Sequence, residues 1–287
     1  MRAHRLAAAA LALALAAAGA SAQPRPPDTF DAAAERARLG LLGLVQQQVM
    51  PRAGGLTAAR IYLWAPLRPA PATGWPVIYM LDGTAVFQAL SRAEGLAHEA
   101  VVVGLGYDSP GRVDGAARAW DYTPRLPGAG PEGTPDPRAP ARRNGGAQGW
   151  LDFIEDEVKP WVRSQVPVDP DRQTLYGHSY GGLFVLETLM TRPETFQRYV
   201  AASPSLWWNA PYMQERLAAW QPAGKLSLQL MVGGEERLAG RATRGDSRDI
   251  ARLLAGKPGL AVSWREFPGL GHGPMLPASA LQALRER

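Results

Sequence analysis

The sequence contains no cysteine, so neither disulfide bonds nor thiolate metal sites can form. It also lacks a stripe of lysine and arginine with interleaved aromatic side chains, and a formal net charge of +5 is modest for 287 residues. Both observations argue against a nucleic-acid partner, although the positive charge suits an anionic small substrate. No internal repeat is present. Beyond the N-terminal region, no run approaches the roughly 20 consecutive apolar residues of a membrane-spanning helix.

The N-terminal region has the pattern of a secretory signal. Arg2 and Arg5 precede an apolar stretch at residues 6–18, and Ala-Ser-Ala follows at 20–22 as a cleavage site. The stretch is too short to span a bilayer. The sequence therefore predicts a signal peptide over residues 1–22 and export of the remaining chain to the periplasm.

Residues 23–287 have the length of a single α/β domain with one sizeable core. A proline-rich start is followed by a predicted helix near residues 32–48. Helical stretches then alternate with strand-like runs, which predicts a mostly parallel sheet covered by helices on both faces. The expected strands lie at residues 59–64, 77–81, 100–105, 173–176, 198–202, 226–232 and 260–267.

The motif Gly-His-Ser-Tyr-Gly at residues 177–181 joins a predicted buried strand to an apolar helix. A Gly-x-Ser-x-Gly motif in this setting is typical of the nucleophile elbow of the α/β-hydrolase fold, in which a sharp turn exposes the serine. Gly177 and Gly181 would allow the strand and the helix to approach closely. The pattern predicts Ser179 as a nucleophile; the alternative is that Ser179 only caps the helix.

A serine nucleophile needs a base within hydrogen-bond reach, most often histidine, and the chain has four histidines. His4 lies in the predicted signal peptide, His178 is adjacent to the serine and should point away from its exposed side, and His98 lies near the end of a predicted helix. His272 lies in a glycine-rich loop after the last predicted strand, where this fold places its catalytic histidine. We therefore predict His272 as the base, with a purely local structural role as the alternative.

The acid of such a triad should follow the penultimate strand, which is predicted to end before Gly-Gly-Glu-Glu at residues 233–236. A carboxylate there would orient the imidazole and stabilise the imidazolium. Glu236 is the preferred candidate, with Glu235 close behind and Asp246 and Asp249 as weaker ones. The alternative is a solvated acidic turn without a catalytic role.

The oxyanion hole of this fold uses the amide of the residue after the nucleophile and an amide from the loop after an early central strand. These rules predict the amides of Tyr180 and Thr84, with Gly83 giving access. Asp82, in the same loop, is expected to stabilise the turn.

Residues 107–147 hold many prolines and glycines and show no convincing periodicity. A loop of this length in a compact domain is usually functional or disordered. It follows the carboxyl end of a central strand, where ligands bind in open α/β folds, and it contains the basic cluster Arg138, Arg142 and Arg143. We expect it to form part of a substrate pocket; the alternative is a mobile surface insertion.

The chain resembles the Fes and IroE-type branch of the esterase D superfamily, whose members are periplasmic esterases that open trilactone triscatecholate siderophores such as enterobactin. The strings that carry the resemblance are Tyr-Met-Leu-Asp-Gly at 79–83, Arg-Ala-Trp-Asp-Tyr-Thr-Pro at 118–124, Gly-His-Ser-Tyr-Gly-Gly-Leu-Phe-Val-Leu at 177–186, Ala-Ser-Pro-Ser-Leu at 202–206 and residues 267–275. The resemblance implies Ser179 as nucleophile, His272 as base and Arg118 as a contact for the catecholate, whose oxygens suit a planar guanidinium. Some of these esterases work with serine and histidine alone, whereas this chain also offers an acid.

Three functions follow from these residues. The first is a periplasmic serine esterase that hydrolyses a ferric or iron-free catecholate siderophore, without a cofactor or a resident metal. The second is a general carboxylesterase for aryl, hydroxycinnamoyl or short acyl esters, in which Trp207 and Trp208 line an apolar pocket. The third is a binding protein that keeps the fold without catalysis.

Overall fold

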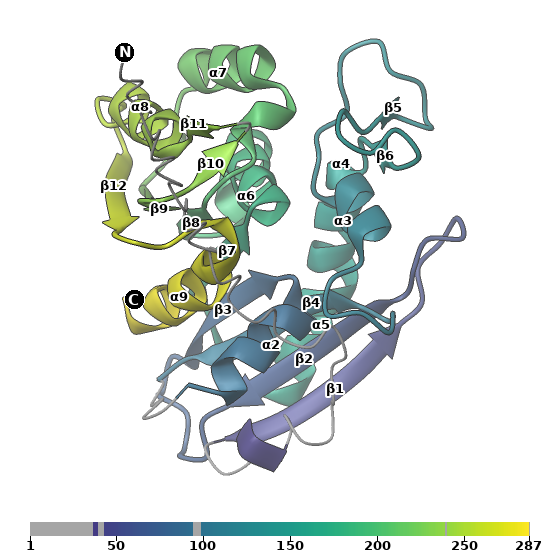
Figure 1. The fold of residues 1–287 in the computed structure, drawn as a ribbon. Helices are drawn as coiled ribbons and strands as arrows, with labels where there is room; N and C mark the ends of the chain where they lie inside the picture. The colour runs from purple at the N-terminus through teal and green to yellow at the C-terminus, as the bar shows by residue number, and fades with distance from the viewer. Residues whose placement is uncertain (1–36, 40–42, 94–98, 239, 287) are drawn as a thin grey trace, which may run out of the picture.

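The structure, a computed structural model, describes residues 37–39, 43–93, 99–238 and 240–286. Its centre is an eight-stranded sheet in the order β1-β2-β4-β3-β7-β8-β9-β12 (Figure 1). β2 is antiparallel to β1 and to β4, and all other neighbours are parallel. The strands are β1 (Leu44–Met50), β2 (Ala59–Ala65), β3 (Trp75–Leu81), β4 (Val101–Tyr107), β7 (Val168–His178), β8 (Arg198–Ala202), β9 (Leu226–Gly233) and β12 (Leu260–Phe267).

All seven predicted strands are present, so the mostly parallel sheet expected from the sequence is confirmed. The predicted helix at residues 32–48 is wrong in its last part. Residues 44–48 belong to β1, whose backbone pairs with β2 along its whole length. The remainder of that prediction falls mostly outside the described residues, as does the whole predicted signal peptide at 1–22.

Successive side chains of the strands enter two different hydrophobic cores because the side chains of a strand alternate between the faces of its sheet. Val77, Tyr79 and Leu81 of β3 pack in one core, and Ile78 and Met80 pack in the other. Helices cover both faces, as the sequence predicted (Figure 1).

The core that contains Ile78 and Met80 is closed by α2 (Gly83–Ser91) and α9 (His272–Arg285), which lie together on one face of the sheet (Figure 1). None of the described helices is long and apolar enough to cross a membrane. The opposite core is closed by α3 (Gly115–Asp121), α4 (Ala147–Phe153), a π-helical turn (Ile154–Val158), α5 (Lys159–Gln165), α6 (Tyr180–Thr191), α7 (Ala210–Ala219) and α8 (Arg244–Leu254), with short 3-10 turns at Pro193–Thr195 and Leu206–Trp208.

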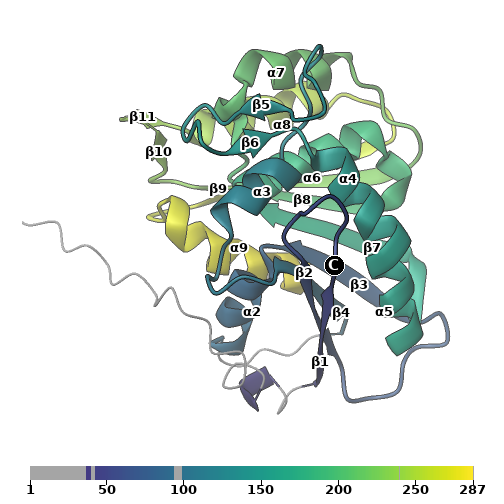
Figure 2. The same ribbon diagram turned by 90° about the vertical axis from the view of Figure 1, so that its right-hand side faces the viewer.

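The long segment between β4 and α4 has secondary structure of its own. It begins with α3 and then forms a small hairpin of β5 (Thr134–Pro135) and β6 (Arg143–Asn144), which lies beside α3 (Figure 2). A second hairpin, of β10 (Arg237–Leu238) and β11 (Arg241–Ala242), follows the end of β9. The sheet strands that precede these hairpins, β4 and β9, run parallel to β7 and end at the same edge of the sheet. Ser179 follows β7 at that edge.

Candidate active site

Ser179 lies at the turn between β7 and α6, with backbone angles of φ 63° and ψ −118°. This region is costly for a residue with a side chain, so the surrounding structure must hold the turn in place. The Ser179 amide donates to the Ala202 carbonyl at 2.9 Å, and the Ser179 carbonyl accepts from the Ser205 amide at 3.1 Å. A Cβ atom at Gly177 would lie 2.3 Å from the carbonyl oxygen of Gly181. The strand–turn–helix geometry of a nucleophile elbow is therefore present.

His272 is the first residue of α9, immediately after the loop that follows β12. Its Nε2 lies 3.0 Å from the Ser179 Oγ, and its Nδ1 lies 2.8 Å from Oε2 of Glu236. Both distances are within the range required of a general base and of the group that orients it. The structure thus brings Ser179, His272 and Glu236 into one chain of hydrogen bonds.

Among the acids considered, Glu236 is the one that the turn after β9 places against His272. The Glu235 amide donates to the Leu270 carbonyl at 3.0 Å, which joins this turn to the loop before His272. The Glu236 carboxylate folds back and accepts from the Gly233 amide at 2.8 Å. Its side chain is 4% exposed, whereas Glu235 is exposed.

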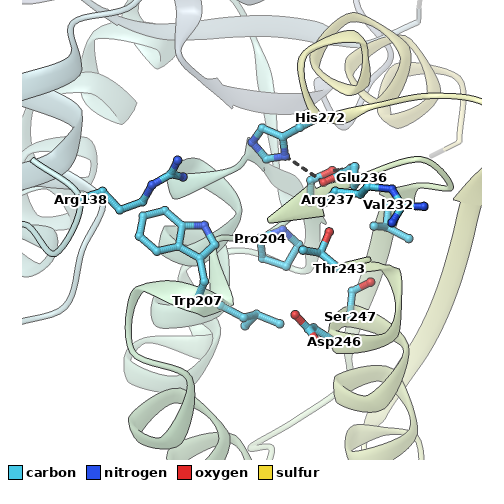
Figure 3. Close-up of a pocket in the computed structure, with 12 residues that line it drawn as sticks. Arg138, Pro204, Trp207, Val232, Glu236, Arg237, Thr243, Asp246, Ser247 and His272 are labelled. Atoms are coloured by element: carbon cyan, nitrogen blue, oxygen red, sulfur yellow. Dashed lines mark hydrogen bonds and ion pairs between the residues drawn. The ribbon is translucent and has the colours of Figure 1, made fainter. Parts of the chain in front are cut away.

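The two other acids considered do not contact the imidazole. Asp249 is exposed on α8 and pairs with Arg252 at 3.3 Å. Asp246 lies on α8 as well, on the side of the neighbouring pocket opposite Trp207 (Figure 3). Among the described residues, Glu236 is the carboxylate that is hydrogen-bonded to His272.

Glu236 is kept ionised by its hydrogen bonds. Burial alone would raise the pKa of this carboxyl group, but hydrogen bonds from His272, from the Ser203 hydroxyl and from the Gly233 amide outweigh burial and lower the pKa below its ordinary value. An ionised Glu236 can only accept in its hydrogen bond with His272, which favours the tautomer with the proton on Nδ1. In that tautomer, Nε2 would be able to accept the Ser179 proton.

His178 is buried, and its ring lies against that of His272 with centroids 4.7 Å apart. Burial lowers the pKa of His178 well below its ordinary value, and the positive charge of Arg118 adds to this shift. A neutral ring at this position packs against His272 without opposing the formation of an imidazolium. His4 and His98 lie outside the described residues.

The two amides expected to bind an oxyanion lie at the starts of neighbouring helices. Tyr180 is the first residue of α6, and Thr84 is the second residue of α2. Amides in the first turn of a helix have no partner within that helix, so they are available to a ligand. Because these helices follow β7 and β3, which are adjacent in the sheet, both amides lie at the same sheet edge. Their oxyanion role stays a prediction.

Arg118 has a partner other than a substrate. Its Nε and Nη2 donate to the Asp82 carboxylate at 2.9 and 2.8 Å, and Nη2 also reaches the His178 carbonyl at 3.3 Å. Burial disfavours the charge, but the Asp82 carboxylate raises the pKa of Arg118 above its ordinary value. The pair ties α3 to the loop that precedes Thr84. The assignment of Arg118 to the siderophore stays a prediction, and this geometry favours a structural role.

Two serines of the Ser-Pro-Ser string after β8 belong to the site although the sequence assigned them no role. Ser203 donates to Glu236, and Ser205 Oγ lies 3.1 Å from Ser179 Oγ. Both side chains are buried. The available signal was their position after the strand that neighbours the nucleophile strand.

A pocket of about 260 Å³ opens beside His272 (Figure 3). Arg138 and Trp207 lie on one side of it, and Thr243, Asp246 and Ser247 lie on the other. The long segment 107–147 therefore contributes the charged side chain of Arg138 to the pocket lining. Its role in binding a substrate stays a prediction. Among the described residues, no group of three or more His, Asp or Glu side chains is arranged to hold a metal ion.

The two tryptophans proposed to line an apolar pocket have different surroundings. Trp207 is half-buried and lines the pocket. Trp208 is buried and donates its indole N–H to the side-chain oxygen of Asn144 at 2.9 Å. The expectation for Trp208 is wrong because its ring packs in the core and its N–H holds β6.

The sequence is similar to those of known esterases. The model of the family described as "Putative esterase" matches residues 57–247. The ferri-bacillibactin esterase BesA of Bacillus subtilis is 36% identical over 242 residues, which cover 78% of this chain and 83% of that protein. The apo-salmochelin esterase of Escherichia coli is 34% identical over 243 residues, covering 78% and 73% respectively.

Solved structures resemble the whole described fold. The BES protein from Bacillus cereus has a TM-score of 0.70 at 32% identity, covering 84% of this chain and 94% of that one. The enterobactin and salmochelin hydrolase IroE has a TM-score of 0.69 at 31% identity, covering 85% and 94%. The α/β-hydrolase fold expected from the sequence is thereby confirmed.

Proposed function

This chain belongs to the Esterase family and is a carboxylic-ester hydrolase, and from that premise we propose that it hydrolyses the ester bonds of a trilactone triscatecholate siderophore of the enterobactin type. The observation that carries the proposal is the hydrogen-bonded chain from Ser179 through His272 to Glu236. His272 and Glu236 also line a pocket that holds the Arg138 side chain and the Trp207 ring. The relatives named as siderophore esterases give the substrate class.

The geometry supports acyl transfer in two halves. Ser179 Oγ attacks an ester carbonyl of the lactone while His272 Nε2 takes the hydroxyl proton, and Glu236 stabilises the resulting imidazolium. The amides of Tyr180 and Thr84 would hold the oxyanion. His272 then returns the proton to the departing alkoxide, which opens the ring and leaves an acyl-enzyme. Water, deprotonated by His272, releases the acid and restores Ser179.

The proposal is tested by incubating the purified protein with iron-free and ferric enterobactin, beside Ser179→Ala. We expect the wild type to produce the linear trimer and then the dimer and monomer, followed by mass spectrometry, and Ser179→Ala to leave the ring intact. The preferred iron state would place the enzyme before or after metal release. Stable enterobactin in the presence of the wild type would overturn the proposal.

A second candidate is a general carboxylesterase for aryl, hydroxycinnamoyl or short acyl esters. The half-buried Trp207 in the pocket wall supports it, because an indole face accepts any flat apolar group. Fast serine-dependent hydrolysis of aryl esters together with stable enterobactin would select this candidate.

We also propose that the enzyme acts in the periplasm. The support is the N-terminal pattern of Arg2, Arg5, the apolar residues 6–18 and Ala-Ser-Ala at 20–22. Expression of the full chain in a Gram-negative host should give a periplasmic protein whose sequence begins at Gln23. A cytoplasmic product that retains residues 1–22 would contradict this proposal.

A further inference from the structure

We propose that Arg138 and Trp207 form a subsite that binds one catechol ring of the substrate, with the guanidinium of Arg138 donating to the adjacent ring oxygens. The inference rests on the proposed function and moves the role of recognising the aromatic anion from Arg118 to Arg138. Both residues line the pocket beside His272 (Figure 3). A ring held there would lie beside His272, whose Nε2 is 3.0 Å from Ser179 Oγ.

Arg138 is available, whereas Arg118, Arg143 and Arg237 are engaged by other groups. It is exposed, and its guanidinium forms no hydrogen bond or ion pair with any residue that the structure describes. Arg118 is bound to Asp82, and Arg143 donates to backbone carbonyls of its own hairpin. Arg237, the other arginine in the pocket wall, donates to the Gly240 carbonyl at 3.1 Å. Arg138 therefore keeps its full fork of N–H donors for a ligand.

The arrangement of Arg138 and Trp207 suits a flat anionic ring. The guanidinium carbon of Arg138 lies 4.8 Å from the centroid of the Trp207 ring, and Trp207 in turn packs on the Tyr180 ring at 5.5 Å. An aromatic ligand can stack against such planar groups, while two neighbouring oxygens match the paired N–H groups of a guanidinium. A catechol supplies both features in one group.

The turn that carries Arg138 is fixed by a buried carboxylate. Asp136 Oδ1 accepts from the amides of Arg138 and Ala139 at 2.9 and 3.0 Å. Asp136 Oδ2 accepts from the Tyr180 hydroxyl at 2.6 Å and from the Asn144 amide group at 3.3 Å. Burial would raise the pKa of Asp136, but these hydrogen bonds together lower it, so the carboxylate stays ionised.

Because Tyr180 directly follows the nucleophile, Asp136 fastens the Arg138 turn to the elbow itself. The Arg138 guanidinium is thus pre-positioned, which reduces the ordering cost of binding.

The pocket of about 260 Å³ is slightly smaller than the ~300–1,000 Å³ of sites that enclose a drug-sized ligand, so it fits one ring and its amide link. The carboxylate of Asp246 on the far side of the pocket would repel an anion and favours the Arg138 side.

The test is direct binding, measured by calorimetry, of two ligands that differ only in the ring hydroxyls: N-(2,3-dihydroxybenzoyl)serine and N-benzoylserine. We expect Arg138→Gln to raise the Kd of the dihydroxy ligand by about 10-fold or more, because a charge-assisted hydrogen bond is lost, and to change the Kd of the benzoyl ligand less than about twofold. Arg138→Lys should restore part of the loss. Arg142→Gln, in the same hairpin but outside the pocket wall, is the matched control and should bind as the wild type does.

Equal losses for both ligands, no change for either, or a wild type that does not bind the dihydroxy ligand would each overturn the subsite. The result is separable from the proposed function. Ring opening of enterobactin with binding insensitive to Arg138 overturns only the subsite. Arg138-dependent binding without ring opening overturns only the siderophore esterase activity.

Discussion

Replacement of Ser179 by alanine is expected to lower kcat for ester hydrolysis by about 10⁶-fold, the loss seen when a serine hydrolase loses its nucleophile. Ser179 Oγ is the hydroxyl 3.0 Å from His272 Nε2, at the strained turn between β7 and α6. Alanine has no group that can form the acyl-enzyme. The backbone hydrogen bonds of the turn use the amide and carbonyl of residue 179, so the variant should keep its fold. Initial rates on an aryl ester and labelling by a fluorophosphonate measure the loss.

Ser205 provides the matched control because its Oγ lies 3.1 Å from Ser179 Oγ in the same site. Ser205→Ala should keep fluorophosphonate labelling and lose far less activity than Ser179→Ala, since only a hydrogen bond to the nucleophile is removed. If Ser179→Ala retained activity that disappeared in the double variant with Ser205→Ala, the nucleophile would be Ser205 and the assignment would be wrong.

The sequence was sufficient for the central sheet because its buried parallel strands appear as short apolar runs between turns. β8 and β9 show this plainly, since their predicted bounds differ from the observed ones by at most one residue. β1 was missed for the opposite reason. It is an edge strand that pairs on one side only, and its centre is Gln-Gln-Gln, which gives neither an apolar run nor an alternating pattern. Tertiary pairing with β2, rather than local preference, makes it a strand.

The positions of the candidate site residues could be predicted where a sequence motif fixes the local geometry. They could not be predicted where the fold of a long loop fixes it. The strained turn at Ser179 follows from Gly-x-Ser-x-Gly, and the position of His272 beside it follows from its place after the last strand. Their catalytic roles stay predictions. The choice between Glu235 and Glu236 depends on how the turn folds back onto the Gly233 amide, which spacing alone does not determine. The position of Arg138 depends on the buried carboxylate of Asp136, which accepts from the Tyr180 hydroxyl. This contact joins segments that are distant in the sequence, so no local pattern predicts it.

Replacement of Glu236 by glutamine is expected to lower kcat by about 10⁴-fold, as for the amide variant of a triad acid. Glutamine keeps the size of the side chain and can still accept from the Gly233 amide, but its NH₂ group cannot accept the Nδ1 proton of His272. The imidazole would then adopt the tautomer that carries its proton on Nε2, facing Ser179, and it could no longer serve as a base. The matched control is Glu235→Gln, an exposed neighbour in the same turn, which should keep the wild-type rate.

The pH dependence of the stability of Glu236→Gln distinguishes a catalytic role of Glu236 from a structural one. The folded-state pKa of Glu236 is lower than its ordinary value of 4.5, so ionised Glu236 adds stability that is fully present above about pH 4.5 and is lost as the pH falls through the folded-state pKa. The wild type should therefore exceed Glu236→Gln in unfolding free energy near neutral pH, and this difference should shrink in acid; denaturant unfolding at several pH values measures it. A large, pH-independent difference would mean that glutamine disrupts packing around Ser203. A pH-dependent difference with almost unchanged kcat would instead mean that Ser179 and His272 work as a dyad and that Glu236 only holds the turn in place.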